Sequence, residues 1–274
     1  MKAGGRLSHF KIKQWFAIIG LFGLTITSFQ NCSKVNFSAN PDFGKSVNPF
    51  CVDVIDSTTS NLKIIFMVDA SGSTLQTDPQ KLYRGKTVQD FVLDYGSKPN
   101  LSFAFGMFSI SASLYDVNTS AFSANAGAPF AGSQYLSSAL NLFLATPDVA
   151  TATTNYRAGF SVVEAAIIRD EIAYPKKSDY AVVFMSDGQP KDIENASGIE
   201  SLITNFVSSV ESRGSGVTVS SVYFGPSSET RAISYMQLIA SEGMGQFVDT
   251  NQLGGADLSI ADIVVVPGQT CSQK

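Results

Sequence analysis

The sequence alternates, over nearly 200 residues, between apolar runs of strand length and segments with helical periodicity. The clearest run is Leu62–Val68, whose near-continuous apolar character is typical of a strand buried on both faces of a sheet. Similar runs occupy residues 101–108, 180–185 and 217–224. This alternation predicts an α/β fold, with a doubly wound, mostly parallel central sheet and helices on both of its faces.

The segments between these runs predict the connecting elements. Asp78 followed by Pro79 indicates a helix N-cap and a first-turn proline. The stretch 118–150 is rich in Ser, Ala and Asn, and it is either a partner-contacting segment or a plain surface loop around one helix. Tyr135 and Tyr156 either line a contact surface or pack against helices. We expect helices near 79–95, 136–144, 157–167, 199–210 and 231–242, and short strands at 112–117 and 246–248.

The composition is that of a globular protein, with 44% apolar and 15% charged residues. The formal net charge is −4, and the segment 1–31 contains four basic residues and no acid, so the remainder of the chain carries −8. Nucleic-acid binding requires a basic surface. The acidic remainder therefore argues against a nucleic-acid partner.

The N-terminus has the pattern of an export signal. A basic segment, Lys2–Lys13, precedes an apolar run of about 15 residues, which is shorter than the roughly 20 needed to span a bilayer. Cys32 follows directly, as in bacterial lipoprotein signals, although Phe29–Asn31 stands where small residues are usual. We expect a signal peptide at 1–31, lipidation of Cys32, a tether at 32–50 and one domain at 51–271. Ordinary cleavage nearby and an uncleaved membrane anchor are the alternatives.

The other two cysteines, Cys51 and Cys271, bracket the part of the chain that is expected to fold. In an oxidising compartment they can form a disulfide, and lipidation of Cys32 leaves an even number of thiols for it. Closing so long a loop stabilises a fold by roughly 5 kcal/mol on the loop-entropy model. The alternative is two unpaired thiols near the domain ends.

Polar residues follow the buried strands, where ligands bind in doubly wound sheets. Asp69-Ala70-Ser71-Gly72-Ser73 comes after the first strand, Ser186-Asp187-Gly188 after the strand at 180–185, and Thr153-Thr154 before a helix. Carboxylates and hydroxyls are the oxygen ligands that Mg²⁺ prefers, and Mn²⁺ or Ca²⁺ also accept them. Because only two acids contribute, the ion stays underneutralised and attracts an acidic group from a partner.

These three motifs, in this order and at these boundaries, resemble the metal-ion-dependent adhesion site of von Willebrand factor A (VWA) domains, over roughly residues 61–266. The resemblance implies that Ser71 and Ser73 bind the metal directly and that Asp69 and Asp187 bind it directly or through water. It implies that Thr154 engages or releases the metal as the site changes state, with Thr153 as the other candidate. Pairing of terminal cysteines also occurs in this family.

Enzyme classes find little support in the sequence. The only histidine is His9, which lies in the signal segment, so Ser-His-Asp catalysis and His-ligated zinc are not expected in the exported domain. Haloacid-dehalogenase-like phosphatases need a second Asp where Ser71 stands, and no nucleophile elbow or phosphate-binding GxxxxGK[ST] loop is present. We therefore expect a non-enzymatic module.

The expected function is metal-dependent protein binding or adhesion, on the outer side of a bacterial membrane. The expected partners are a protein that offers an acidic side chain and, through the N-terminal lipid, the membrane. An envelope-assembly scaffold that uses the same site is the alternative, with a Mg²⁺-dependent phosphohydrolase as a more distant one.

Overall fold

The computed structural model describes residues 61–174, 176–254 and 257–268, and all structural statements below concern these residues. The expected signal peptide, the tether, Cys32, Cys51 and Cys271 lie outside them. The expected domain boundaries at 51 and 271 lie outside them as well.

One seven-stranded sheet has the order β4-β3-β2-β1-β5-β6-β7. β1 lies near its centre and pairs in parallel with both β2 and β5, and β6 and β7 continue the parallel part. β3 and β4 are antiparallel and form one edge. The strands are β1 (Asn61–Asp69), β2 (Leu101–Phe108), β3 (Ala112–Asp116), β4 (Ala121–Ser123), β5 (Ser178–Ser186), β6 (Val217–Tyr223) and β7 (Met244–Asp249).

Helices connect the strands. The helical elements are α3 (Thr74–Thr77), the π-helix η1 (Leu82–Lys86), α4 (Thr87–Tyr95), α5 (Ser133–Ala145), α6 (Tyr156–Ala173), α7 (Ala196–Ser212), α8 (Thr230–Glu242) and the 3₁₀ turns η2 (Thr250–Gln252) and η3 (Ile260–Asp262).

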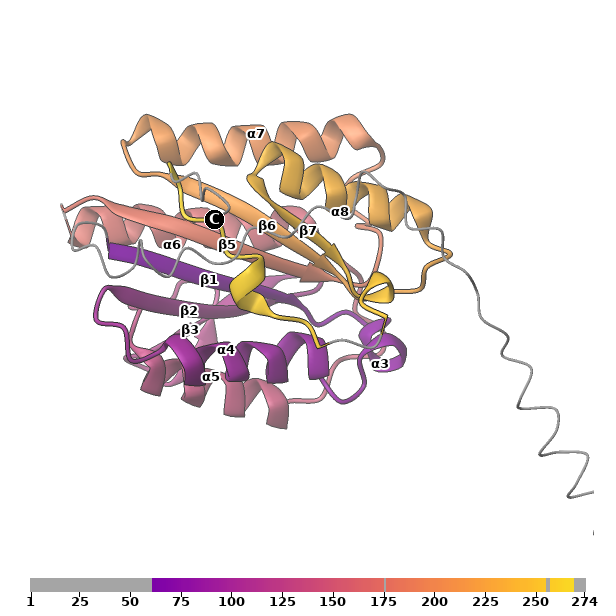
Figure 1. Cartoon of the computed structure of the whole chain (residues 1–274), viewed down its shortest axis with the longest axis horizontal. Coiled ribbons are helices and arrows are strands. Elements are labelled where there is room, and N and C mark those ends of the chain that lie inside the picture. The colour runs from indigo at the N-terminus through magenta and orange to yellow at the C-terminus, as the bar shows by residue number, and fades with distance from the viewer. Residues whose placement is uncertain (1–60, 175, 255–256, 269–274) are drawn as a thin grey trace, which may run out of the picture. The chain divides into compact units, whose positions relative to one another are not determined.

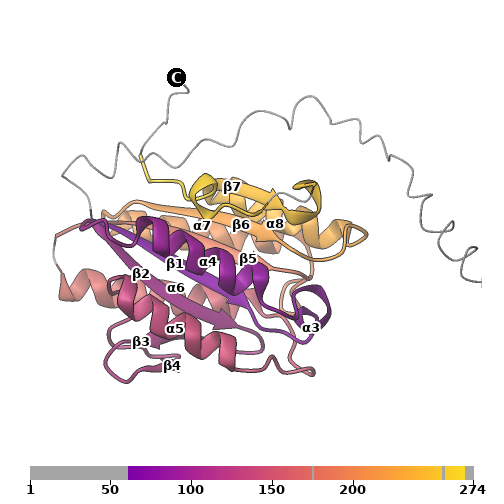
Figure 2. The same cartoon turned by 60° about the horizontal axis from the view of Figure 1, so that its bottom comes forward.

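Both faces of the sheet are covered, because successive strand residues point to opposite sides. Ile65 and Met67 of β1 pack in one apolar cluster with α6, α7 and α8. Ile64 and Phe66 pack in a second cluster with α4, α5 and the segment 258–266. In Figures 1 and 2 the strands accordingly lie between α4 and α5 on one side and α6, α7 and α8 on the other. The predicted doubly wound, mostly parallel α/β fold is confirmed.

Stacked aromatic rings fix the start of α6 against the sheet. The ring of Phe184 in β5 stacks on Phe108 of β2 at 4.6 Å and on Phe160 of α6 at 4.8 Å between centroids. Tyr156, the first residue of α6, meets Phe184 edge-on at 5.0 Å. Such pairs stabilise by more than their buried area alone. The loop that precedes α6 therefore has a fixed position at the carboxyl edge of the sheet.

The expected helix start at Asp78–Pro79 is wrong by a few residues. Asp78 ends α3, and the next helical element begins at Leu82. The carboxylate of Asp78 still caps that element, because Oδ1 accepts hydrogen bonds from the backbone N–H of Leu82 at 2.6 Å and of Tyr83 at 3.3 Å. Asp78 therefore accepts backbone hydrogen bonds at the start of this helix, as expected, but from three residues before the N-cap position, which is Lys81.

The segment 118–150 contains more structure than the sequence indicated. It includes the edge strand β4 as well as α5, and Ala126 and Phe130 within it contribute to the core clusters. The apolar residues of the segment 258–266, which the sequence did not predict to be an element, close one face of the sheet. The strand β4 is short and the segment 258–266 is irregular, so neither carries a readable periodicity.

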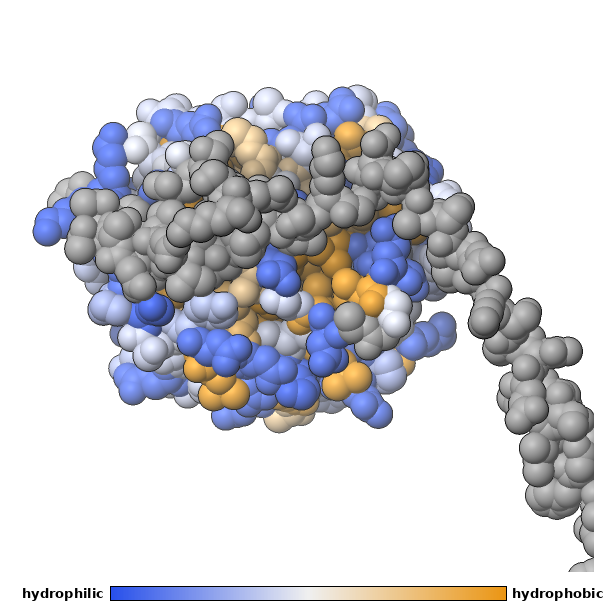
Figure 3. All heavy atoms as spheres, in the orientation of Figure 1, coloured by the Kyte–Doolittle hydropathy of each residue, from blue (hydrophilic) through white to orange (hydrophobic). Residues whose placement is uncertain are grey.

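Exposed apolar residues are scattered over the surface. In Figure 3, the face that carries α4 shows small separate areas of apolar surface among polar residues. Leu93 of α4 is 75% exposed, and single exposed residues of this kind are normal on soluble surfaces. None of the helices in the described part of the chain is both long and apolar enough to cross a membrane.

Candidate metal site at the carboxyl edge of the sheet

Asp69 ends β1 at the carboxyl edge, and its side chain is completely buried. Its Oδ1 accepts a hydrogen bond from the backbone N–H of Ser71 at 2.7 Å. Its Oδ2 accepts one from the hydroxyl of Ser186, the last residue of β5, at 2.6 Å. The carboxylate is therefore held by the end of β5 and by the first turn of the loop that follows β1.

Asp187 follows β5 and faces the same loop. Its Oδ1 accepts a hydrogen bond from the Ser73 hydroxyl at 2.8 Å, and its Oδ2 accepts one from Thr77 at 2.5 Å. The hydroxyls of Ser71 and Ser73 lie 3.1 Å apart. A continuous set of polar contacts thus joins the loop after β1 to the loop after β5.

Thr154 reaches the same place from the segment before α6. A Cβ built on Gly188 would lie 3.8 Å from the hydroxyl of Ser73 and 4.0 Å from that of Thr154, so both hydroxyls line the space above Gly188. Thr154 is buried, whereas its neighbour Thr153 is exposed. The structure thus brings together Asp69, Ser71, Ser73, Thr154 and Asp187, the set that the sequence motifs singled out, and leaves Thr153 outside.

Gly72 allows the loop before α6 to approach so closely. Its backbone N–H donates a hydrogen bond to the carbonyl of Ala152 at 2.9 Å. A Cβ at this position would lie only 2.1 Å from the carbonyl oxygen of Ala150. Any side chain would therefore push the two loops apart, so glycine is needed here for close backbone approach.

The pKa values of both carboxyl groups are raised above the usual value for aspartate. Burial, and then the nearby charge of Asp187, raise the pKa of Asp69 from 3.8 to about 7. Burial also raises the pKa of Asp187, although hydrogen bonds from Thr77 and Ser73 oppose that shift. A buried acid with a raised pKa favours either a proton or a cation beside it. The pair of acids is thus poised to accept a positive charge.

Arg84 supplies that charge only in part, because its positive charge lowers the pKa of Asp187 but does not outweigh the effect of burial. Arg84 is fully buried, and its Nη1 donates to the backbone carbonyl of Asp69 at 2.7 Å rather than to the carboxylate. Its Nε donates to Asp78 at 3.0 Å and its Nη2 to Asp148 at 2.9 Å. Within the described ranges, no lysine or arginine forms an ion pair with Asp69 or Asp187.

The donor set fits a hard divalent cation. Two carboxylates and three hydroxyls converge, and all of these donors are oxygen atoms, as Mg²⁺ prefers. No cluster of three or more His, Cys, Asp and Glu side chains occurs among the residues that the structure describes, so a softer, zinc-type ligand set is not found there. Three of the five candidate ligands are hydroxyls, which explains why the two acids alone do not form such a cluster.

The sequence assigned no role in the site to two residues that contact its acids. Ser186 and Thr77 each donate a hydrogen bond to one of the two acids. Ser186 directly precedes Asp187, and its position at a strand end was the available signal. Thr77 had none, because its approach to Asp187 depends on the short helix α3.

Tyr156 does not line a contact surface. It is completely buried, and its hydroxyl donates to the carbonyl of Gly188 at 2.8 Å. The alternative, that it packs within the fold, is correct, because the first turn of α6 lies over Phe108 and Phe184. Tyr135 in α5 is 40% exposed.

Comparison with known proteins yields a likeness of fold only. No protein-family model matches the sequence, and no curated protein matches it significantly. Solved structures named for the VWA type of domain are among those whose fold is similar to that of the chain.

Three of these structures illustrate the similarity. A von Willebrand factor type A protein from Catenulispora acidiphila is 14% identical, with a TM-score of 0.46 and 70% of this chain and 38% of that chain covered. The ArnB paralog VWA2 from Sulfolobus acidocaldarius is 16% identical, with a TM-score of 0.43 and coverages of 70% and 42%. The pili tip protein Mfa5 from Porphyromonas gingivalis is 10% identical, with a TM-score of 0.48 and coverages of 72% and 48%. This chain thus spans less than half of each of these chains.

Proposed function

We propose that this protein is a metal-dependent protein-binding module, which holds an acidic side chain of a partner through a divalent cation, most readily Mg²⁺. Asp69, Ser71, Ser73, Thr154 and Asp187 hold the cation, directly or through water. Mn²⁺ and Ca²⁺ are the other candidates. The module performs no chemical reaction on its partner.

The observation that carries this proposal is the burial of two carboxylates with which no lysine or arginine of the described residues forms an ion pair. Asp69 and Asp187 are 0% and 2% exposed, and the hydroxyls of Ser73 and Thr154 line the space above Gly188. A buried charge without a counter-charge costs several kcal/mol, and a bound cation removes that cost. Two carboxylates neutralise a divalent ion only when both are fully ionised and close to it. A site that relies on hydroxyls for its other ligands therefore leaves affinity for a further anion.

The acidic group of a partner supplies that anion. The candidate site lies at the carboxyl edge of the sheet, where Ser73 is exposed and Gly188 is half-buried. A partner carboxylate can thus complete the coordination from outside. Charge on the partner also speeds the encounter, because opposite charges attract at long range.

The proposed location is the outer side of a bacterial membrane, with Cys32 lipidated and the domain carried on the tether 32–50. A single acyl chain gives only reversible membrane binding, so stable anchoring requires the multiple acyl chains of a lipoprotein. A mass spectrum of the purified mature protein tests this part alone. An unmodified N-terminus at a residue other than Cys32 contradicts it.

Calorimetry tests the metal site. Titration of Mg²⁺ into the wild-type protein at pH 8, up to millimolar concentrations, is expected to give saturable binding. Asp69→Ala and Ser71→Ala are expected to abolish it while the circular dichroism spectrum stays unchanged. Asp94→Ala and Ser137→Ala are the matched controls, because both side chains are exposed on helices away from the site. The absence of saturable binding of Mg²⁺, Mn²⁺ and Ca²⁺ to the wild-type protein contradicts the proposal.

A pull-down with and without EDTA tests the partner. Bound proteins that are retained in Mg²⁺ and released by EDTA are expected from the wild-type protein but not from Asp69→Ala. A partner retained equally in EDTA and by the variant contradicts metal-dependent binding. The identity of the partner separates adhesion to another cell from organisation of the cell's own envelope. Hydrolysis of a generic phosphate ester would instead support the phosphohydrolase alternative.

A further inference from the structure

A cavity of about 130 Å³ opens beside the candidate metal site. Its wall begins at Ala70, the residue directly after Asp69, and continues through the end of β2 to the segment 146–149. Consecutive Cα atoms are 3.8 Å apart. The cavity is therefore one residue away from a proposed metal ligand, so one short stretch of a partner chain can reach both.

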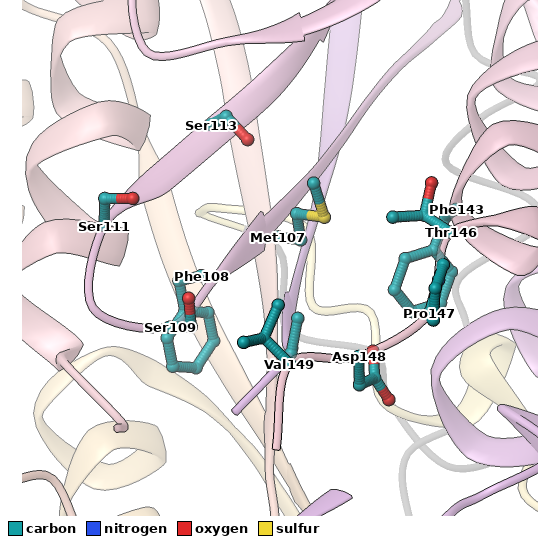
Figure 4. A pocket seen from close by; sticks show the side chains of 11 residues that line it. Met107, Phe108, Ser109, Ser111, Ser113, Phe143, Thr146, Pro147, Asp148 and Val149 are labelled. Atoms are coloured by element: carbon teal, nitrogen blue, oxygen red, sulfur yellow. The ribbon is translucent and has the colours of Figure 1, made fainter. Parts of the chain in front are cut away.

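The lining of the cavity is mainly apolar. Met107 and Phe108 of β2, Phe143 of α5 and the loop residues Pro147 and Val149 contribute to it. In Figure 4, Ser111 and Ser113 lie on one side of Met107, and Phe143 and Pro147 lie on the other. A cavity of about 150 Å³ holds a benzene ring. This one is thus of the size of a single aliphatic side chain.

The one acid in the lining is already neutralised. Asp148 accepts a hydrogen bond from Arg84 at 2.9 Å and one from Thr74 at 2.9 Å, and it lies 3.6 Å from the ammonium of Lys81. Its side chain is only 4% exposed. A lysine or arginine from a partner therefore gains little from this carboxylate, and the lining favours an apolar occupant over a cationic one.

The cavity is also preformed. The ammonium of Lys81 donates to the carbonyl oxygens of Phe143, at 2.6 Å, and of Thr146. The backbone N–H of Ala152 donates to the carbonyl of Val149 at 2.9 Å, and Gly72 holds Ala152 in turn. A wall that is fixed before binding costs little ordering entropy when it is filled.

Two exposed apolar side chains lie beside this wall. Val149 lines the cavity and is 59% exposed, and Ile110, between the lining residues Ser109 and Ser111, is 61% exposed. The carbonyl of Ile110 accepts a hydrogen bond from Asn155 at 3.4 Å, which ties the loop after β2 to the residue next to Thr154. Two exposed apolar side chains thus lie on the loops next to the cavity, one of which is tied to the residue beside Thr154.

We propose that this cavity receives an aliphatic side chain of the partner, of the size of leucine, adjacent in sequence to the acidic residue that binds the metal. This inference rests on the proposed function and states which partner residues the protein prefers. The partner is recognised by an acidic–aliphatic pair of residues.

Capped dipeptides test the proposal on the full chain in mild detergent with saturating Mg²⁺. The probes are acetyl-Asp-Leu-amide and acetyl-Leu-Asp-amide, with the serine analogues in both orders and acetyl-Asp-Lys-amide for comparison. At least one leucine probe is expected to bind about tenfold more tightly than its serine analogue, because the leucine side chain leaves water. It is also expected to shift the NMR signal of the Met107 methyl group.

Two variants place the preference in the cavity. Ser113→Phe fills the cavity from β3, and Val149→Ser removes an apolar part of the wall at an exposed position where folding is not at risk. Both are expected to reduce the preference for leucine to less than about twofold, while Mg²⁺ binding stays unchanged. Ser137→Phe, on the exposed face of α5, is the matched control and is expected to keep the preference.

The outcomes separate the two proposals. Equal binding of leucine and serine probes, tightest binding of the lysine probe, or no binding of any probe to Mg²⁺-loaded protein overturns the cavity proposal and leaves the metal site standing. Retention of the leucine preference by both variants overturns it as well. Failure of Mg²⁺ itself to bind in calorimetry overturns both.

Discussion

Asp78, Asp148 and Asp170 are buried beside cations, whereas Asp69 and Asp187 are buried beside hydroxyls. Arg84 forms ion pairs with Asp78 at 3.0 Å and Asp148 at 2.9 Å, and Lys63 pairs with Asp170 near the opposite end of β1. The pKa of Asp69 is raised by burial and by Asp187 to about 7. Among the described residues, the fold thus gives Asp78, Asp148 and Asp170 an ion pair and gives none to the two acids at the carboxyl edge of the sheet.

The largest expected effect on the free energy of unfolding comes from removing the arginine that pairs with Asp78 and Asp148. Arg84→Met leaves Asp78 and Asp148 buried without their shared partner, and such a loss costs about 3–5 kcal/mol. Urea unfolding followed by circular dichroism is the measurement. Arg84→Lys, which keeps the charge but not the forked geometry, is expected to lose less. A loss below about 1 kcal/mol for Arg84→Met would mean that these acids do not depend on their cation.

Removing the charge of Asp69, which is buried without an ion pair, is expected to stabilise the metal-free protein. Between pH 4 and pH 7 the folded state holds a proton on Asp69 that the unfolded chain releases, because the pKa rises from 3.8 to about 7. This contribution to stability is present below pH 4 and lost as the pH rises through 7. At about 1.4 kcal/mol per pKa unit, it amounts to about 4 kcal/mol.

Asp69→Asn has no carboxyl group to ionise at this position, so it avoids the loss of stability that the wild type undergoes above pH 7. At pH 8 without metal, we expect the variant to be more stable than the wild type by about 2 kcal/mol, since weaker hydrogen bonds offset part of the gain. Asp148→Asn is the matched control, and it is expected to be destabilised because its cations lose their partner. Urea unfolding at pH 5 and pH 8 distinguishes the two groups. Equal destabilisation of both variants at pH 8 would erase the distinction.

A smaller effect is expected on metal affinity. Because Asp69 must lose its proton to bind a cation, Mg²⁺ is expected to bind about tenfold more weakly at pH 6 than at pH 8. Calorimetry in two buffers of different ionisation enthalpy also counts the proton released on binding. An affinity independent of pH between 6 and 8 would show that Asp69 is already ionised without the metal.

The smallest effect is expected where an acid pairs with a cation in solvent. Lys86 and Asp90 of η1 and α4 lie 2.8 Å apart, and both side chains are more than half exposed. Lys86→Ala is expected to change the free energy of unfolding by less than about 0.5 kcal/mol. A loss similar to that of Arg84→Met would mean that burial does not separate the groups of acids.

Sequence patterns predicted the elements whose signals are local. The apolar run Leu62–Val68 and the helical stripe from Ile199 to Val210 each carry a period that identifies the element. The convergence of the two acids followed from one rule, that parallel strands end at the same edge. The irregular segment 258–266 has no such period, and its burial depends on which face of the sheet α4 and α5 leave open.

The supporting polar contacts could not be predicted in the same way. Arg84 contacts the backbone of Asp69 and the side chain of Asp148, which is 64 residues further along the chain. Such a contact depends on the π-helical turn at Leu82–Lys86, for which a single sequence gives no reliable signal. The candidate ligands are therefore readable from the sequence, whereas the residues that hold them in place are not.

The central position of β1 has a mechanical consequence. A partner held at Asp69 pulls on the carboxyl end of this strand, and the proposed anchor at Cys32 pulls on its amino end, Asn61. Between these two points, β1 is hydrogen-bonded in parallel register to β2 on one side and β5 on the other. A load between the proposed anchor and a partner at the proposed site therefore runs, as far as Asp69 bears it, along the covalent backbone of β1, and the hydrogen bonds to β2 and β5 need not open to carry it.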